Sequence, residues 1–150
     1  MAEQKIYQFN LPEDWGSTSL QYQNELNVTN IDVDPQELRF FTSGTKALLL
    51  GADGDNVYEL SLSSAWEIQT AVLSHTFDIS GQTTTPTGLA VKYDDKGFYV
   101  CDESGYVYQY GMTSKADLNS ASFTKSVDFS SVIATAQSVF FSPDGQTMQL

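Results

Sequence analysis

The sequence has 150 residues and a formal net charge of −12, with Arg39 as its single arginine. That length fits one globular domain with a buried core, and the acidic charge excludes nucleic acid and anionic membranes as partners, because both would repel it. No run approaches the roughly 20 apolar residues that are needed to span a bilayer.

The amino terminus has no signal-peptide pattern, because Met1 is followed by Ala2, Glu3 and Gln4 rather than by a basic start and an apolar block. We therefore expect a cytoplasmic protein, or one that is packaged into a virion from the cytoplasm. Cys101 is the single cysteine and cannot form an internal disulfide, so we predict a buried, inert thiol within a strand.

Short alternating runs rich in Tyr, Phe, Val and Leu recur between turn residues along the chain, which predicts an all-β structure. Three runs align with one another: IYQFNLPEDW, VYELSLSSAW and VYQYGMTSKA. Their tyrosines Tyr7, Tyr58 and Tyr108 are 51 and 50 positions apart, and 49 positions lead from Tyr108 through the end of the chain and on to Tyr7. The three spacings therefore add up to 150, the length of the chain.

Other positions keep the same spacing and place the strands of one repeat. Paired apolar residues recur at Phe40-Phe41, Ala90-Val91 and Phe140-Phe141. In the second unit we expect strands near residues 38–42, 46–51, 56–62 and 71–79. A four-stranded antiparallel repeat of roughly 40 to 50 residues is typical of a β-propeller blade. We predict one propeller segment with about three blades: a half blade over 1–35, blades over 36–85 and 86–136, and a half blade over 137–150.

These residues also resemble a family of propeller repeats found in bacterial surface proteins and phage structural proteins, whose pattern reads GLAFSPDGTKLYV…VYQYDLSTPWDIS. The matching segments are Gly88-Leu89-Ala90, Ser142-Pro143-Asp144-Gly145, Val57-Tyr58-Glu59-Leu60 and Trp66-Glu67-Ile68. The third unit departs from the pattern, with Ala116 in place of the tryptophan and Tyr93-Asp94-Asp95 in place of the Pro-Asp-Gly turn. The resemblance implies a scaffold with many uses.

Both chain ends fall inside a predicted blade, so each end leaves an unpaired sheet edge that is unstable against pairing. Three blades are fewer than the roughly 4 to 8 of known propellers, and two-fold symmetry is the commonest in homo-oligomers. We therefore predict a six-bladed homodimer with two composite blades. The expected inter-chain closure residues are Ile6, Tyr7, Phe9, Leu11, Val139, Phe140, Phe141, Met148 and Leu150. The alternative, a fragment of a longer propeller protein, stays open.

No sequence motif of a common hydrolase, phosphate-binding enzyme or dinucleotide-binding enzyme occurs. His75 is the only histidine and falls in a predicted outer strand, where a surface role is the simpler interpretation. Asp53, Asp55 and Asn56 offer oxygen ligands for calcium, but their spacing is not that of an EF-hand, so we favour a hairpin turn. We predict no catalytic residue, no metal and no cofactor.

Trp15 and Trp66 are the candidate ligand-binding residues, because each follows a predicted strand by a few residues and a tryptophan on a loop can stack on a sugar ring. Their recurrence also fits packing between blades, which we favour. The first hypothesis is a non-enzymatic oligomeric module of phage or bacterial origin that binds a structural protein or a host surface. The alternative is a multivalent lectin that binds surface glycans through Trp15 and Trp66.

Overall fold

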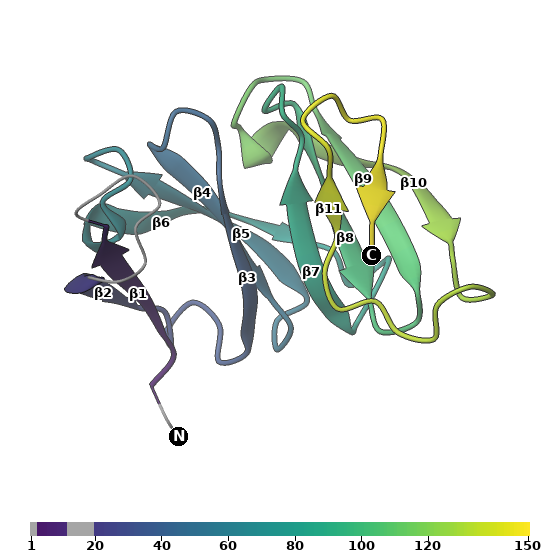
Figure 1. Ribbon diagram of the computed structural model, residues 1–150, viewed down its shortest axis with the longest axis horizontal. Coiled ribbons are helices and arrows are strands. Elements are labelled where there is room, and N and C mark those ends of the chain that lie inside the picture. Colours follow the sequence, from purple (N-terminus) through teal and green to yellow (C-terminus); the bar gives the residue numbers. More distant parts are fainter. Residues whose placement is uncertain (1–2, 12–19) are drawn as a thin grey trace.

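The computed structural model describes residues 3–11 and 20–150, which form an all-β structure (Figure 1). The strands are β1 (Lys5–Asn10), β2 (Gln21–Asn27), β3 (Pro35–Phe40), β4 (Lys46–Gly51), β5 (Asn56–Leu62), β6 (Ala71–Asp78), β7 (Pro86–Val91), β8 (Gly97–Asp102), β9 (Tyr106–Met112), β10 (Ala121–Asp128), β11 (Phe140–Phe141) and β12 (Met148–Gln149). Two short 3-10 helices, η1 (Ile68–Thr70) and η2 (Leu118–Ser120), precede β6 and β10.

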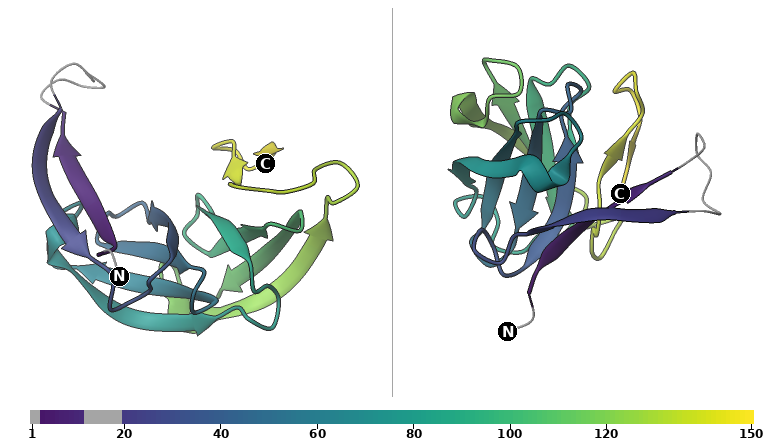
Figure 2. Two further views of the ribbon diagram at one scale, coloured as in Figure 1. Left: turned by 90° about the horizontal axis from the view of Figure 1, so that it is seen from below. Right: turned by 90° about the vertical axis from the view of Figure 1, so that its left-hand side faces the viewer.

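The strands form four antiparallel sheets in the order of the sequence. Strands β3 to β6 make one four-stranded sheet and β7 to β10 another, and in both sheets neighbours in sequence are neighbours in space. Strands β1 and β2 form a separate hairpin, as do β11 and β12. Figure 2 shows the four sheets along a curved arc with the two hairpins at its ends. The prediction of an all-β chain built from antiparallel meanders is confirmed.

The strands of the second unit lie close to their predicted positions. β4 and β5 have the expected bounds, and β6 ends one residue early. β3 covers 35–40 rather than 38–42, because Pro35 already pairs with Gly51 ahead of a bulge. Phe41 leaves the strand for the turn, where its backbone N–H donates to the Lys46 carbonyl.

The pairing register repeats from sheet to sheet, and we call residues at the same place in the register counterparts. A register shift follows Gln8 in β1 and Glu59 in β5, and the same shift lies beside Gln109 in β9. The β1–β2 hairpin is therefore the counterpart of β5–β6 and β9–β10. The β11–β12 hairpin pairs Phe141 with Met148 and is the counterpart of β3–β4 and β7–β8.

One sequence alignment is wrong by a residue. The sequence matched Phe40 with Ala90, but the ladders pair Phe40 with Ala47 and Val91 with Phe98, which makes Val91 the counterpart of Phe40. The cause is a difference in turn length, since the β8–β9 connection is one residue shorter than the β4–β5 connection. A constant spacing of 50 therefore fits positions after that turn and misplaces those before it.

The core consists of three layers, one between each pair of adjacent sheets. The central layer joins the two four-stranded sheets through Phe41, Leu48, Leu50, Val57, Ile79, Leu89, Phe98, Val100, Tyr108, Tyr110, Met112 and Leu118. In β4, Leu48 and Leu50 face this layer, while Ala47 and Leu49 face the layer beneath the β1–β2 hairpin. Alternate residues of one strand thus serve two cores, which explains its continuous apolar sequence.

Candidate functional site

The β1 segment carries a row of exposed apolar side chains, Tyr7, Phe9 and Leu11, which we call the β1 row. They are 55%, 48% and 47% exposed. Their counterparts in the two complete sheets are at most 8% exposed: Tyr58, Leu60, Leu62, Tyr108, Tyr110 and Met112. In β9, these counterparts pack against the preceding four-stranded sheet. The β1 row is therefore a packing face without a preceding sheet among the described residues.

A matching groove of about 200 Å³ lies at the other end of the arc. We call it the carboxyl-terminal groove; it is lined by Tyr99, Val107, Gln109, Lys125, Val127, Phe129, Phe141 and Met148. Its lining from β8 to β10 corresponds to a surface of the β3–β6 sheet that includes Leu48, Val57 and Ile79, which are fully buried under the next sheet. The groove is therefore the place where a further third strand would pack.

A larger hollow of about 440 Å³ lies between the β7–β8 turn and the β11–β12 turn. The rings of Tyr99 and Phe141 pack against each other in it, with centroids 4.3 Å apart and planes tilted by 32°. In the β3–β6 sheet, Trp66 covers the equivalent place, since its ring lies 5.0 Å from that of Phe40 and over Gly44. Gly145 is the counterpart of Gly44 and has no described atom within 4 Å of its Cβ position. The hollow is thus the place that Trp66 covers in the β3–β6 sheet, and at the β11–β12 hairpin no described side chain covers it.

The structure assigns packing contacts within the chain to some of the predicted site residues and leaves the others exposed. The backbone N–H of Trp66 donates to the Gly44 carbonyl, and the half-exposed indole ring of Trp66 covers Phe40. Trp15 lies outside the described residues. Ile6 packs under the β1–β2 hairpin, and the carboxyl-terminal closure residues Val139, Phe141 and Met148 pack together at the opposite end. Phe140 and Leu150 are exposed.

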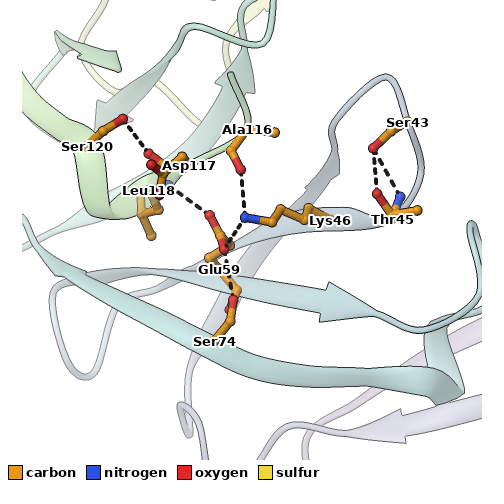
Figure 3. A network of polar contacts seen from close by, with 9 residues as sticks. All are labelled: Ser43, Thr45, Lys46, Glu59, Ser74, Ala116, Asp117, Leu118 and Ser120. Carbon is orange, nitrogen blue, oxygen red and sulfur yellow. Dashed lines mark hydrogen bonds and ion pairs between the residues drawn. The ribbon is translucent and has the colours of Figure 1, made fainter. Parts of the chain in front are cut away.

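Glu59 is a buried acid that joins the two four-stranded sheets (Figure 3). Its Oε2 accepts the Leu118 backbone N–H at 2.8 Å, and its Oε1 accepts from Lys46 Nζ at 2.8 Å and from Ser74 Oγ at 2.9 Å. Burial alone would raise the pKa of Glu59, but these donors together hold it below its ordinary value. With its oxygens already bound, Glu59 acts as a structural link.

Two other buried carboxylates, those of Asp32 and Asp102, accept hydrogen bonds from the hydroxyls of counterpart tyrosines. The Tyr58 hydroxyl donates to Asp32 at 3.0 Å, and the Tyr108 hydroxyl donates to Asp102 at 2.9 Å. Asp32 also accepts the backbone N–H groups of the β4–β5 turn, at Asp53 and Gly54. These bonds hold that turn as a hairpin, which is the interpretation favoured from the sequence. The carboxylate of Asp32 is directed toward backbone N–H donors.

The remaining candidate groups have ordinary surroundings. His75 is partly buried on the outer strand β6, and Cys101 is fully buried in β8, where burial raises the pKa of its thiol. Across residues 3–11 and 20–150, no three His, Cys, Asp or Glu side chains are grouped so that they could hold a metal ion. The same residues include no helix that is long and apolar enough to cross a membrane.

Comparison with known proteins gives a likeness of fold alone. No protein-family model matches the chain, and no curated protein matches it. A crystal structure of a protein from Lactobacillus plantarum superposes with a TM-score of 0.58 at 17% sequence identity. The match covers 83% of this chain and 35% of that one, so the chain corresponds to about a third of the length of that protein.

Proposed function

We propose that the chain is a non-enzymatic structural or interaction module that joins a second copy in a six-bladed β-propeller, with two blades shared between the copies. The observation that carries this proposal is the contrast in burial along the third strand of each unit. Phe9 is half-exposed, whereas its counterparts Leu60 and Tyr110 are fully buried against a preceding sheet. A second copy would supply that sheet.

The positions of the hollows support the same assembly. The carboxyl-terminal groove and the 440 Å³ hollow flank the β11–β12 hairpin. A third hollow of about 250 Å³ lies under the β1–β2 hairpin and is lined in part by Ile6, Gln8 and Leu38. All three occur where a four-stranded unit has only two strands, so completing the two hairpins would cover them.

The closed ring would present repeated loops on a rigid frame to a protein partner. The resemblance to repeats of phage structural and bacterial surface proteins supports a role in a virion or at a cell surface. The lectin alternative has less support, because the ring of Trp66 packs against Phe40 and over Gly44. The bonds to Glu59, Asp32 and Asp102 likewise support structural rather than catalytic roles for the buried acids.

Light scattering and native mass spectrometry at micromolar and nanomolar concentrations test the assembly. We expect a particle of two chains, which Phe9→Asp dissociates into monomers because it places a charge in an apolar joint. Val72→Asp is the matched control, since Val72 is 65% exposed on the outer strand β6, and it should leave the dimer intact. A monomeric wild-type chain at micromolar concentration would refute the proposal.

A glycan array tests the alternative. The wild-type particle should give no sugar-specific signal. A signal that Trp66→Ala abolishes while the protein stays folded and dimeric would favour the lectin and count against a purely structural module.

A further inference from the structure

The two hairpins at the ends of the arc are complementary halves of one four-stranded sheet. Resting on the proposed two-copy assembly, we infer that β12 of one copy pairs with β1 of the second copy, antiparallel and in one fixed register. The predicted opposite pairs are Met148 with Phe9, Gln149 with Gln8, and Leu150 with Tyr7. The joint between copies is then a continuous sheet rather than a contact between preformed surfaces.

The register follows from the two complete sheets. In both sheets, the second and third strands pair at three equivalent positions. The pairs are Ala47↔Leu60, Leu48↔Glu59 and Leu49↔Tyr58 in the β3–β6 sheet, and Phe98↔Tyr110, Tyr99↔Gln109 and Val100↔Tyr108 in the β7–β10 sheet. Met148 is the counterpart of Ala47 and Phe98, because each lies opposite the last apolar residue of the first strand. Phe9 is the counterpart of Leu60 and Tyr110. Transferring the register gives the three predicted pairs.

The backbone edges of both strands are open to a partner. Within the part of the chain that the structure describes, β12 pairs with β11 alone and β1 pairs with β2 alone. An open edge carries unpaired N–H and C=O groups that favour the addition of a strand. Pairing β12 with β1 would give each hairpin the four-stranded arrangement of the complete sheets.

The side chains beside these edges also fit. In the complete joint between the two four-stranded sheets, the rings of Phe77 and Tyr110 meet edge to face with centroids 5.6 Å apart. The counterparts of this pair are Val127, which lines the carboxyl-terminal groove, and Phe9 of the β1 row. Both are exposed, at 43% and 48%. The register that pairs β12 with β1 places the β1 row over this groove.

A second copy is the occupant that the geometry favours. The two open edges belong to one repeat, yet they lie at opposite ends of the arc (Figures 1 and 2). They can therefore pair between copies, with the β1 edge of each copy bound to the β12 edge of the other. Such a reciprocal exchange closes after two copies, which satisfies two-fold symmetry.

Cysteine pairing between two differently substituted chains tests the register. Gln8→Cys and Gln149→Cys are made separately, mixed and oxidised, and the products are measured by intact mass and on a non-reducing gel. Directly opposite residues have Cα atoms about 4.5–5.5 Å apart, which lies within the span of a disulfide. Cys101 is fully buried and can stay in place. We expect the mixture to give a disulfide-linked pair of one chain of each kind.

Asn10→Cys mixed with Gln149→Cys is the matched control. Asn10 is polar, lies on the same strand as Gln8 and is two positions along, so its diagonal distance from residue 149 is about 7–8 Å. The control mixture should cross-link at least about tenfold more slowly, because Cα atoms beyond about 7 Å are not bridged without backbone movement. Circular dichroism of each variant before mixing checks that it is folded.

Hydrogen exchange on the unsubstituted protein gives a second measurement. The amides of β1 and β12 should be protected in the two-chain particle and lose that protection on dilution to monomer. A two-chain particle without the bond between positions 8 and 149, or with faster bonding at the Asn10 control, overturns this inference and leaves the proposed function standing. A wild-type chain that stays monomeric overturns the proposed function itself.

Discussion

Glu59 on β5 and Leu118 on η2 connect the two four-stranded sheets through a hydrogen bond of 2.8 Å from the Leu118 backbone N–H to Glu59 Oε2. Gln8, the counterpart of Glu59, makes the same 2.8 Å bond to the backbone N–H of Ile68. A polar side chain thus links the third strand of one sheet to the 3-10 helix of the next. Glu59 differs by carrying a charge, which Lys46 balances at 2.8 Å.

Glu59→Gln separates the hydrogen bond from the ion pair. Glutamine keeps an acceptor for Leu118, as Gln8 does for Ile68, but it loses the charge that faces Lys46. We expect the free energy of unfolding at pH 7 to fall by about 1 kcal/mol, and by about 2–3 kcal/mol for Glu59→Leu, which leaves the buried N–H without an acceptor. Urea titrations measure both.

The same residue makes stability depend on pH. Because the pKa of Glu59 is lower in the folded than in the unfolded chain, its stabilisation is complete above the unfolded value near 4.5 and is lost as pH falls through the folded value. Urea titrations between pH 6 and pH 3 should give a steeper loss for wild type than for Glu59→Gln. Equal slopes would show that Glu59 is not the group responsible.

The buried tyrosine hydroxyls support a third prediction. Tyr58→Phe and Tyr108→Phe each remove a hydrogen bond to a buried carboxylate, at Asp32 and Asp102, and should lower the free energy of unfolding by about 1–2 kcal/mol. Tyr7→Phe is the control at the third repeat position, where the side chain is 55% exposed, and should have little effect on folding. Equal losses at all three positions would contradict the assignment.

Sequence patterns predicted the strands well where both faces of a strand are covered. β4 is an example, because its continuous apolar run predicts a buried strand and its observed bounds match the predicted ones. The match of Phe40 with Ala90 failed because a single residue is missing from a turn, which leaves no mark on the apolar pattern. The link from Glu59 to Leu118 was also missed, because its acceptor and donor are 59 positions apart and the donor is a backbone group.

Gly44→Ala tests the packing of Trp66. A Cβ at Gly44 would lie 2.3 Å from the indole ring, and its φ of +68° already favours glycine. Gly145→Ala is the control, since its φ is +69° and its Cβ position is open among the described residues. We expect about 1 kcal/mol of destabilisation at Gly145 from the backbone alone and about 2–4 kcal/mol at Gly44. Thermal unfolding of the monomer at low concentration measures the difference.

The two departures from the repeat pattern, at Ala116 and Asp95, are structurally linked. They are the counterparts of Trp66 and Gly44, and Ala116 donates its N–H to the Asp95 carbonyl as Trp66 does to that of Gly44. Asp95 has a φ of +57°, and its carboxylate accepts the backbone N–H of Thr42 in the neighbouring sheet at 3.2 Å. A side chain at position 95 occupies the place where an indole would lie, so alanine stands at 116.

A double-mutant cycle tests this coupling. Ala116→Trp alone should destabilise by about 2–3 kcal/mol, because the ring meets Asp95. Asp95→Gly alone should cost about 1 kcal/mol, since the lost bonds to Thr42 outweigh the relief of the positive φ. The double variant recreates the Gly44–Trp66 arrangement and should be more stable than the sum of the single effects by at least about 1 kcal/mol. Strict additivity would mean that the two positions are independent.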